Sequence, residues 1–254
     1  MKQIEIRKPS VQSLFIKMRF NDKEISTGTG FIVESSVGHI FFTNRHNLTG
    51  RNNDTGKILS QKTAAIPNNI LIGYNSKGES EEYLWIEENI LEEDGTPLWF
   101  EHPTLKGKAD FVALKLTKLP DGKIHSYDFR ETGPDISCGP AGSVSVVGFP
   151  FGIKAGGLPI WVTGFIASEM DVDFEDLPLF LIDCRCRKGL SGSPVIVHAS
   201  NGLVNMKDSS VLHFKAPITK FLGIYSGRVN EESDLGKVWK ASALLELVES
   251  IENL

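Results

Sequence analysis

The sequence predicts an all-β protein, an antiparallel barrel or sandwich, that ends in a single α-helix. Two observations point to this fold class. Short apolar stretches, rich in β-branched and aromatic residues, recur between turns marked by Gly, Pro, Asn and Asp. A helical apolar period occurs only near the C-terminus. At 254 residues the chain can form one large β domain or two small barrels that share an interface.

The expected strands follow the apolar stretches. Leu14–Phe20, for example, alternates in the manner of a strand with one buried face. Gly148–Gly152 matches no dinucleotide or phosphate loop, so it is expected to be a turn between strands. In chain order the expected strands are 14–20, 30–34, 39–43, 69–74, 82–86, 111–116, 143–148, 161–167, 179–184, 194–198 and 221–225.

The rest of the chain is expected to form one helix and surface loops. Residues 235–254 carry Val238, Leu244, Val248 and Ile251 on one helical face, so an amphipathic helix should pack against the β domain. Residues 49–68 and 200–210 are polar and are expected to be loops on the surface.

Composition narrows the class of function. The chain is 41% hydrophobic and 23% charged, as in ordinary globular proteins. Its formal net charge is -5 and no basic block occurs, so nucleic acid is not expected as a partner. No apolar run approaches the roughly 20 residues of a membrane span, and Met1–Ser10 lacks the apolar core of a secretory signal. We therefore expect a cytoplasmic protein without a membrane partner.

The cysteines support the same expectation. Cys138, Cys184 and Cys186 leave an odd thiol under any pairing, and a bridge across the single residue between Cys184 and Cys186 would be strained. Cys and His do not occur at the spacing of a zinc site. Reduced thiols are expected, as in cytosolic proteins, and neither a metal nor an organic cofactor is expected.

The segment Gly189–Pro194 (GLSGSP) is the most informative one. A serine hydroxyl is a weak nucleophile at neutral pH, so serine catalysis needs a tight turn and a nearby base. The glycines here would let the N–H groups of Gly189 and Ser191 converge as an oxyanion hole. Ser191 is therefore a candidate nucleophile. The alternative is a simple Ser/Gly turn that opens a strand.

Two other segments could supply the base and its partner. His46 follows the expected strand 39–43 and could act as a general base, or it could be an ordinary surface histidine. Asp110 opens an apolar strand, where a carboxylate is costly unless a partner uses its charge. An imidazole N–H is such a partner, although Asp110 could also be a plain turn residue. The order His46, Asp110, Ser191 is one of the known orders of the serine-peptidase triad.

These segments belong to a series that resembles the trypsin-like peptidases of the chymotrypsin clan. The likeness is to the divergent form found in bacterial high-temperature-requirement (Deg) stress proteases and in some viral proteases. The series covers nearly the whole chain and is specific for the superfamily, not for one member. The matching segments, in family order, are Gly28–Val33 (GTGFIV), Thr43–His46 (TNRH), Ala109–Lys115 (ADFVALK), Val146–Gly152 (VVGFPFG), Gly189–Pro194 (GLSGSP) and Gly223–Ser226 (GIYS).

The resemblance implies a fold and a reaction. The fold is two six-stranded antiparallel β-barrels, one in residues 1–125 and one, with the closing helix, in residues 126–254, which together form one peptidase domain. The reaction is cleavage of a protein or peptide substrate by Ser191, with His46 as general base and Asp110 orienting it. The Gly189 and Ser191 amides would bind the oxyanion. The oligomeric state stays open.

Three positions depart from the family pattern. Leu190 stands where digestive members carry an Asp that pairs with a new N-terminus after zymogen cleavage, so such activation is not expected. Ser193 replaces the second glycine of the family's SGGP. Arg45 is bulky where the family often has a small residue, and it could line the cleft or point to solvent.

Substrate preference is less well defined. Arg185 stands six positions before Ser191, where the family often has the residue at the floor of its primary pocket. In that role it implies a preference for acidic side chains. Arg187 or Lys188 could act instead, or all three could form a solvated basic loop. Ser226 and Gly227 are expected to border the cleft, where an extended substrate could pair with the strand.

Two other functions are compatible with the sequence. One is a non-catalytic trypsin-fold module that binds a peptide or partner in its cleft. The other is a specialised signalling or defence protease with a single partner substrate. All three triad side chains are present, which favours catalysis over simple binding.

Overall fold

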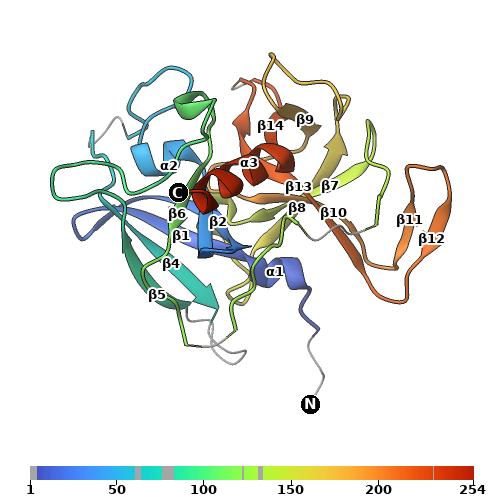
Figure 1. Cartoon of the computed structure of the whole chain (residues 1–254), viewed down its shortest axis with the longest axis horizontal. Coiled ribbons are helices and arrows are strands. Elements are labelled where there is room, and N and C mark those ends of the chain that lie inside the picture. Colours follow the sequence, from blue (N-terminus) through green and yellow to red (C-terminus); the bar gives the residue numbers. More distant parts are fainter. Residues whose placement is uncertain (1–4, 61–63, 76–82, 122, 131–133, 231) are drawn as a thin grey trace.

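The computed structural model describes residues 5–60, 64–75, 83–121, 123–130, 134–230 and 232–254. Within them, strands form two groups that meet side by side, and a helix near the C-terminus lies over their junction (Figure 1). The first group holds the N-terminal part of the chain and the second the C-terminal part.

The N-terminal group is a six-stranded antiparallel sheet in the order β5-β4-β1-β2-β3-β6. Its edges approach each other through residues 90–100, where the Leu98 N–H donates to the Ile90 carbonyl (3.0 Å) and Phe100 bridges to Ala113 of β6. The sheet therefore curls into the first barrel. The strands are β1 (Ser13–Phe20), β2 (Lys23–Ser35), β3 (Gly38–Thr43), β4 (Asn69–Asn75), β5 (Tyr83–Asn89) and β6 (Val112–Lys115).

The C-terminal group is a closed barrel in the order β10-β13-β14-β9-β8-β7. A separate hairpin, β11 (Leu203–Asn205) and β12 (Val211–His213), projects from it (Figure 1). The predicted all-β fold with two barrels and a C-terminal helix is thus confirmed. The barrel strands are β7 (Ser143–Gly148), β8 (Ile160–Ile166), β9 (Leu179–Asp183), β10 (Pro194–Ala199), β13 (Ile218–Arg228) and β14 (Leu235–Lys240).

Helices are short except at the C-terminal end. They are α1 (Lys8–Gln12), α2 (Arg45–Thr49), α3 (Ala241–Glu252) and two 3₁₀ turns, Lys106–Lys108 and Pro150–Gly152. The prediction of a helix from residue 235 was wrong for its first six residues, which form β14. This strand is hydrogen-bonded to β13 on one side and β9 on the other, and closing the barrel outweighs the local helical period.

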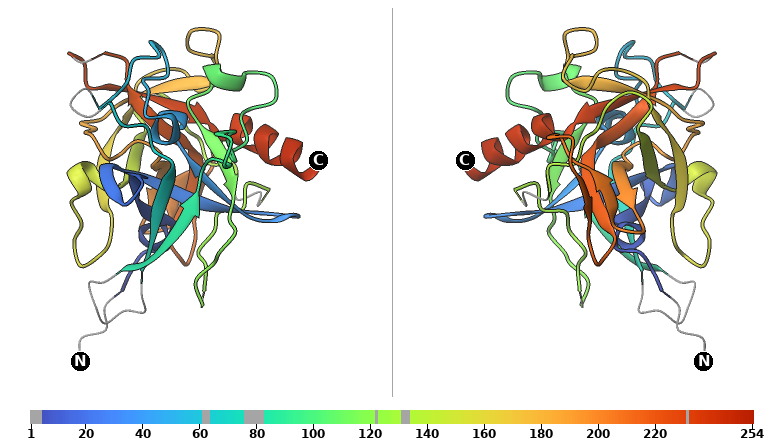
Figure 2. Two further views of the ribbon diagram at one scale, coloured as in Figure 1. Left: turned by 90° about the vertical axis from the view of Figure 1, so that its left-hand side faces the viewer. Right: turned by 90° about the vertical axis from the view of Figure 1, so that its right-hand side faces the viewer.

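The two barrels share one apolar core. The ring of Phe31 on β2 lies 5.4 Å from that of Phe221 on β13, and Phe111 lies 5.4 Å from Trp239 on β14. The buried face of α3 packs into the same cluster (Leu244, Leu247, Val248, Ile251). Figure 2 shows α3 at one edge of the molecule. Its buried face packs against residues of both barrels. β6 ends at Lys115 and β7 begins at Ser143; a division at residue 125 stays a prediction.

Some segments differ from the prediction. β2 begins seven residues earlier than expected, and the hairpin strand β11 falls inside the expected loop 200–210. Glu82 and residues 61–63, part of an expected strand and an expected loop, lie outside the described residues. The three cysteines are unpaired thiols. None of the helices in the described ranges is long and apolar enough to span a membrane.

Candidate active site

His46 and Asp110 lie at the ends of neighbouring strands. His46 is in the first turn of α2, which begins two residues after β3 ends, and Asp110 lies two residues before β6, which pairs with β3. The imidazole Nδ1 lies 2.7 Å from Asp110 Oδ2, and the His46 backbone N–H donates to Oδ1 at 3.0 Å. Both carboxylate oxygens are thus directed at the same residue. The carboxylate therefore fixes the ring orientation and makes Nδ1 the protonated nitrogen, which leaves Nε2 as a base.

Neighbouring side chains hold this pair in place. The Asn44 amide donates to the Asp110 carbonyl at 2.6 Å, so the turn before α2 is tied to the start of β6. Arg45 forms an ion pair with Glu101 through Nε and Oε1 at 2.8 Å and is about one-quarter exposed. Glu101 thus engages its guanidinium, and the two roles expected for Arg45, lining the cleft or pointing to solvent, stay predictions.

Ser191 lies in a tight turn before β10 whose shape requires glycine. Gly189 and Gly192 have φ of +95° and +87°, in the left-handed region that favours glycine. A Cβ on Gly192 would lie 2.1 Å from the Thr29 carbonyl oxygen, and one on Gly189 would lie 2.3 Å from that of Phe149. Any larger residue at either position would have to move the backbone.

The two halves of the molecule meet at the Ser191 carbonyl. That oxygen accepts the Thr29 N–H at 3.0 Å and the Asn47 amide at 3.2 Å. Asn47 adjoins His46 in α2, so these bonds bring all three predicted catalytic residues into one region. Across the described part of the chain, no hydrogen bond joins His46 to the Ser191 hydroxyl. Such bonds are often loose in free enzymes and tighten only when substrate binds.

The turn also presents two backbone donors. The N–H groups of Leu190, Gly192 and Ser193 are bonded to the carbonyls of Arg187, Tyr225 and Leu190, respectively. Those of Gly189 and Ser191 have no hydrogen-bond partner among the residues described. They are the two amides predicted as an oxyanion hole, and both are available to a ligand.

Thr29 is a residue that the sequence did not single out. Its buried hydroxyl donates to the Gly189 carbonyl at 2.8 Å and accepts the Phe149 N–H at 3.2 Å. It therefore fixes the peptide between Gly189 and Leu190, which lies between the two predicted oxyanion donors. Gly28–Val33 was recognised as a family segment, but the partners of Thr29 come from the other barrel, more than a hundred residues away, and no local pattern reveals them.

The predicted substrate-binding residues lie on two segments. Arg185 is exposed between the buried Cys184 and Cys186, whereas Arg187 Nη1 lies 3.1 Å from Asp234 Oδ1. Ser226 and Gly227 lie on β13 directly after Tyr225, whose carbonyl accepts the Gly192 N–H. The structure therefore places β13 beside the Ser191 turn. No described contact ties Arg185 to that turn.

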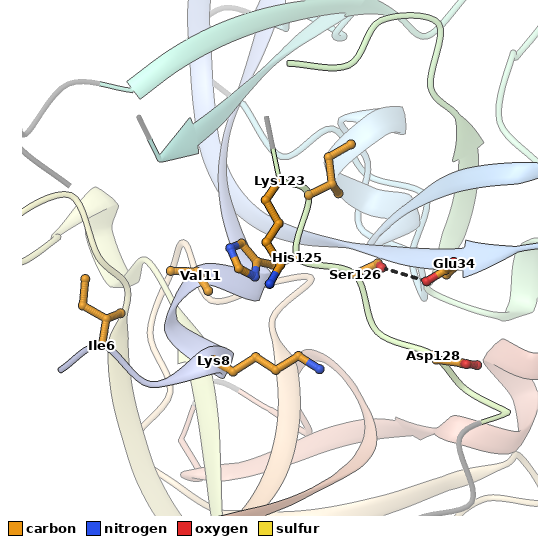
Figure 3. Close-up of a pocket in the computed structure, with 9 residues that line it drawn as sticks. Ile6, Lys8, Val11, Glu34, Lys123, His125, Ser126 and Asp128 are labelled. Carbon is orange, nitrogen blue, oxygen red and sulfur yellow. Dashed lines mark hydrogen bonds between the residues drawn. The ribbon is translucent and has the colours of Figure 1, made fainter. Parts of the chain in front are cut away.

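The structure also has a pocket of about 700 Å³, whose lining residues are drawn in Figure 3. Its lining residues are Ile6, Lys8, Val11, Glu34, Lys123, Ile124, His125, Ser126 and Asp128. Burial, together with the nearby Lys123 and Lys8, lowers the pKa of His125. None of the predicted site residues lines the pocket. The described residues include no group of three or more His, Cys, Asp or Glu that could hold a metal.

Comparison with known proteins finds similar folds among solved structures only. No protein-family model matches the sequence, and no curated protein matches it. Among solved structures, the active form of the Rv3671c protease from M. tuberculosis is 17% identical, with 96% of this chain and 82% of that chain covered and a TM-score of 0.54. An inactive form of that protease gives a TM-score of 0.51, with 17% identity, 96% of this chain and 89% of that chain.

A second protein gives the same result. The serine endoprotease of Yersinia pestis is 10% identical, with 98% of this chain and 68% of that chain covered and a TM-score of 0.54. These likenesses extend over nearly the whole chain. The protein therefore has the chymotrypsin-like two-barrel fold of trypsin-like serine proteases.

Proposed function

We propose that this protein is a serine endopeptidase that acts through Ser191, His46 and Asp110. The observation that carries the proposal is the double engagement of His46 by Asp110, through Nδ1 at 2.7 Å and the backbone N–H at 3.0 Å. Because Asp110 engages Nδ1 and the backbone N–H of His46, the other ring nitrogen, Nε2, can act as a base. His46 is next to Asn47 in the chain, and the Asn47 amide donates to the Ser191 carbonyl, so the base and the proposed nucleophile lie in one region.

The proposed reaction is acyl transfer. The Ser191 hydroxyl gives its proton to His46 Nε2 as its oxygen attacks the peptide carbonyl, and the resulting oxyanion accepts the N–H groups of Gly189 and Ser191. His46 then gives the proton to the leaving amine, and the C–N bond breaks. Water, activated by His46 in the same way, hydrolyses the acyl-enzyme and regenerates Ser191.

The decisive experiment is labelling by a fluorophosphonate probe, which phosphonylates an activated serine. The wild-type protein should be labelled and Ser191→Ala should not. Ser193→Ala is a matched control, because Ser193 lies two residues away with a buried Oγ that has no partner among the described residues. Labelling of Ser191→Ala at the wild-type rate would contradict the proposal.

The same probe separates the alternative functions when it is combined with a general protease assay on casein. Labelling with casein cleavage supports a general peptidase. Labelling without casein cleavage supports a specialised protease with a single partner substrate. Absence of labelling supports a non-catalytic module that binds a peptide in its cleft.

Preference for acidic side chains is a further part of the proposal. Arg185 is exposed on the segment that leads into the Ser191 turn, and a guanidinium binds carboxylates through charge-assisted hydrogen bonds. Cleavage of a peptide library should then favour Asp or Glu directly before the scissile bond, and Arg185→Gln should remove that preference. Arg187→Gln is the control, because Asp234 engages Arg187. A library with no acidic preference would contradict this part alone.

We also propose a cytoplasmic, bacterial setting for the enzyme. Three cysteines that are unpaired thiols suit a reducing compartment. Titration of the denatured protein, purified without reductant from a native source, should find three free thiols per chain. A smaller number would argue for an oxidising compartment.

A further inference from the structure

An exposed aromatic side chain borders the candidate oxyanion hole. Phe151 lies in the 3₁₀ turn Pro150–Gly152, between β7 and β8, and is 63% exposed. Its φ of +53° is in the left-handed region, which bulky residues rarely adopt. Exposure of the phenyl ring to water and strain in the backbone both lower the stability of the fold. Residues with such strained backbones are common at functional sites.

The backbone of Phe151 is fixed directly beside Gly189. Its N–H donates to the Lys188 carbonyl at 2.6 Å, and a Cβ built on Gly189 would lie 3.0 Å from the Phe151 nitrogen. The turn is closed from behind, where the Gly152 N–H donates to the Phe149 carbonyl at 3.0 Å. The ring is therefore carried by a held segment next to one of the two proposed oxyanion donors.

A neighbouring aromatic cluster buries another phenylalanine of the same segment. Phe149, two residues earlier, is fully buried, and its ring lies 5.0 Å from that of Phe15, beside Tyr83 and Trp85. Phe151 makes no ring contact within the residues that the structure describes. Its side chain therefore adds little to this core and is free to contact a ligand.

We propose that Phe151 forms an apolar subsite for the substrate residue that follows the scissile bond. The inference rests on the proposed peptidase function. The Ser191 turn has two flanks, β13 through the bond from Gly192 to Tyr225, and Pro150–Gly152 through the bond from Phe151 to Lys188. An extended substrate that pairs along β13 on one side of Ser191 leaves the site over the other flank. An apolar side chain there covers the exposed ring.

The test uses peptides that differ only in the residue after the scissile bond, Leu or Ser, in a sequence that the wild-type enzyme cleaves. The measured quantity is the ratio of kcat/KM for the two peptides. The wild type should prefer Leu, and Phe151→Ala should reduce the ratio about tenfold, the scale of a lost apolar contact. Phe151→Asn should do the same and is easier to fold, because Asn adopts left-handed φ readily.

The matched control is Phe165→Ala, which removes another phenylalanine, 55% exposed on β8. Phe165 pairs with Ser143 at the far end of β7 from Gly148, about 17 Å along the strand, so its ratio should stay at the wild-type value. Fluorophosphonate labelling of Phe165→Ala should match the wild type, and labelling of the two Phe151 variants shows whether their nucleophile and base are still intact.

Each outcome has a separate meaning. A wild-type ratio in both Phe151 variants, with normal labelling, overturns the subsite and leaves the peptidase function standing. An equal fall in kcat/KM for the Leu and Ser peptides, which leaves their ratio at the wild-type value, overturns the assignment to the leaving side. A wild-type protein that the probe does not label overturns the peptidase function, and the subsite with it.

Discussion

The two barrels hold their parts of the candidate site by different means. The N-terminal barrel uses side chains, since Asp110 bonds His46 through both carboxylate oxygens and the Asn44 amide bonds the Asp110 backbone. The C-terminal barrel uses backbone shape, since Gly189 and Gly192 take left-handed conformations in a turn whose Gly189 and Ser191 N–H groups have no partner among the described residues. One half positions a charge and the other positions dipoles.

This difference decides how each half can fail. Replacing one polar atom of the His46–Asp110 pair should remove function while the fold stays intact. In the C-terminal half, one added methyl group meets a backbone carbonyl at 2.1 to 2.3 Å and must displace the turn itself. Substitutions in the two halves should therefore separate chemistry from conformation.

The largest effect is expected from Asp110→Asn. The amide keeps the shape but cannot accept from both the His46 ring and its backbone N–H, so the imidazole loses its tautomer and orientation. In a serine triad the corresponding change lowers kcat about 10⁴-fold. The labelling rate should fall in proportion, with little change in the melting temperature. The exposed Asp121→Asn is the control; an equal loss there would mean that general charge, not the pair, is responsible.

A smaller loss of activity is expected from Gly189→Ala. Its Cβ would meet the Phe149 carbonyl oxygen at 2.3 Å, and alanine at φ +95° is strained. The peptide would rotate and withdraw one oxyanion donor, which typically costs about 10²–10³ in kcat. Unlike Asp110→Asn, this change should also lower the melting temperature. Gly139→Ala is the control, because a Cβ there meets nothing within 4 Å. Full activity in Gly189→Ala would refute the role of this amide.

The sequence predicted the parts of the fold that depend on local pattern. Strands with alternating or β-branched residues were found close to where they were expected, because that pattern suits a sheet with one buried face. β14 was missed, since Val238 fits both a helical stripe and a strand, and only its pairing with β9 and β13 decides. Register and barrel closure are long-range properties that short windows of sequence do not contain.

For the site, motifs identified the chemistry but not its supports. The arrangement of His46 and Asp110 agrees with the roles predicted for them, which stay predictions until tested. Thr29, Asn44 and Asn47 were not assigned, because each acts through a partner distant in the chain. Phe151 was hidden for another reason. A phenylalanine in a sequence predicts burial, and its exposure depends on the left-handed turn that carries it.

Thr29 connects the two halves through its hydroxyl, so Thr29→Val should lower both the stability and the activity by modest amounts. Valine keeps the shape but leaves the buried Phe149 N–H without its acceptor and the Gly189 carbonyl without its donor. We expect a loss of about 1–3 kcal/mol in the free energy of unfolding and about tenfold in kcat/KM, since oxyanion donors must be held in place. Denaturant unfolding and peptide hydrolysis measure the two effects. Thr29→Ser retains the hydroxyl and should restore both.

The smallest effect concerns His102, where the N-terminal half meets α3. His102 is 1% exposed, its Nδ1 accepts the Leu105 N–H at 3.2 Å, and its Nε2 lies 3.2 Å from Glu246 Oε2. Burial lowers the pKa of His102 below its usual 6.5, and Glu246 opposes that shift only in part. The unfolded chain therefore binds a proton more readily, and stability should fall as the pH drops through 6.5. Burial lowers the pKa of His125 and His198 too, with the same sign.

Melting curves between pH 7.5 and 5 measure this dependence. His102→Asn should remove part of it, about 2–4 °C in a chain of this size, because the Asn oxygen can accept from Leu105 without titrating. Glu246→Gln should steepen the fall, since it removes the carboxylate that stabilises the protonated ring. If both variants followed the wild-type curve, the contact of His102 with Glu246 on α3 would not contribute to the pH dependence of stability. The acid sensitivity would then lie with His125 and His198, away from the junction of the two halves.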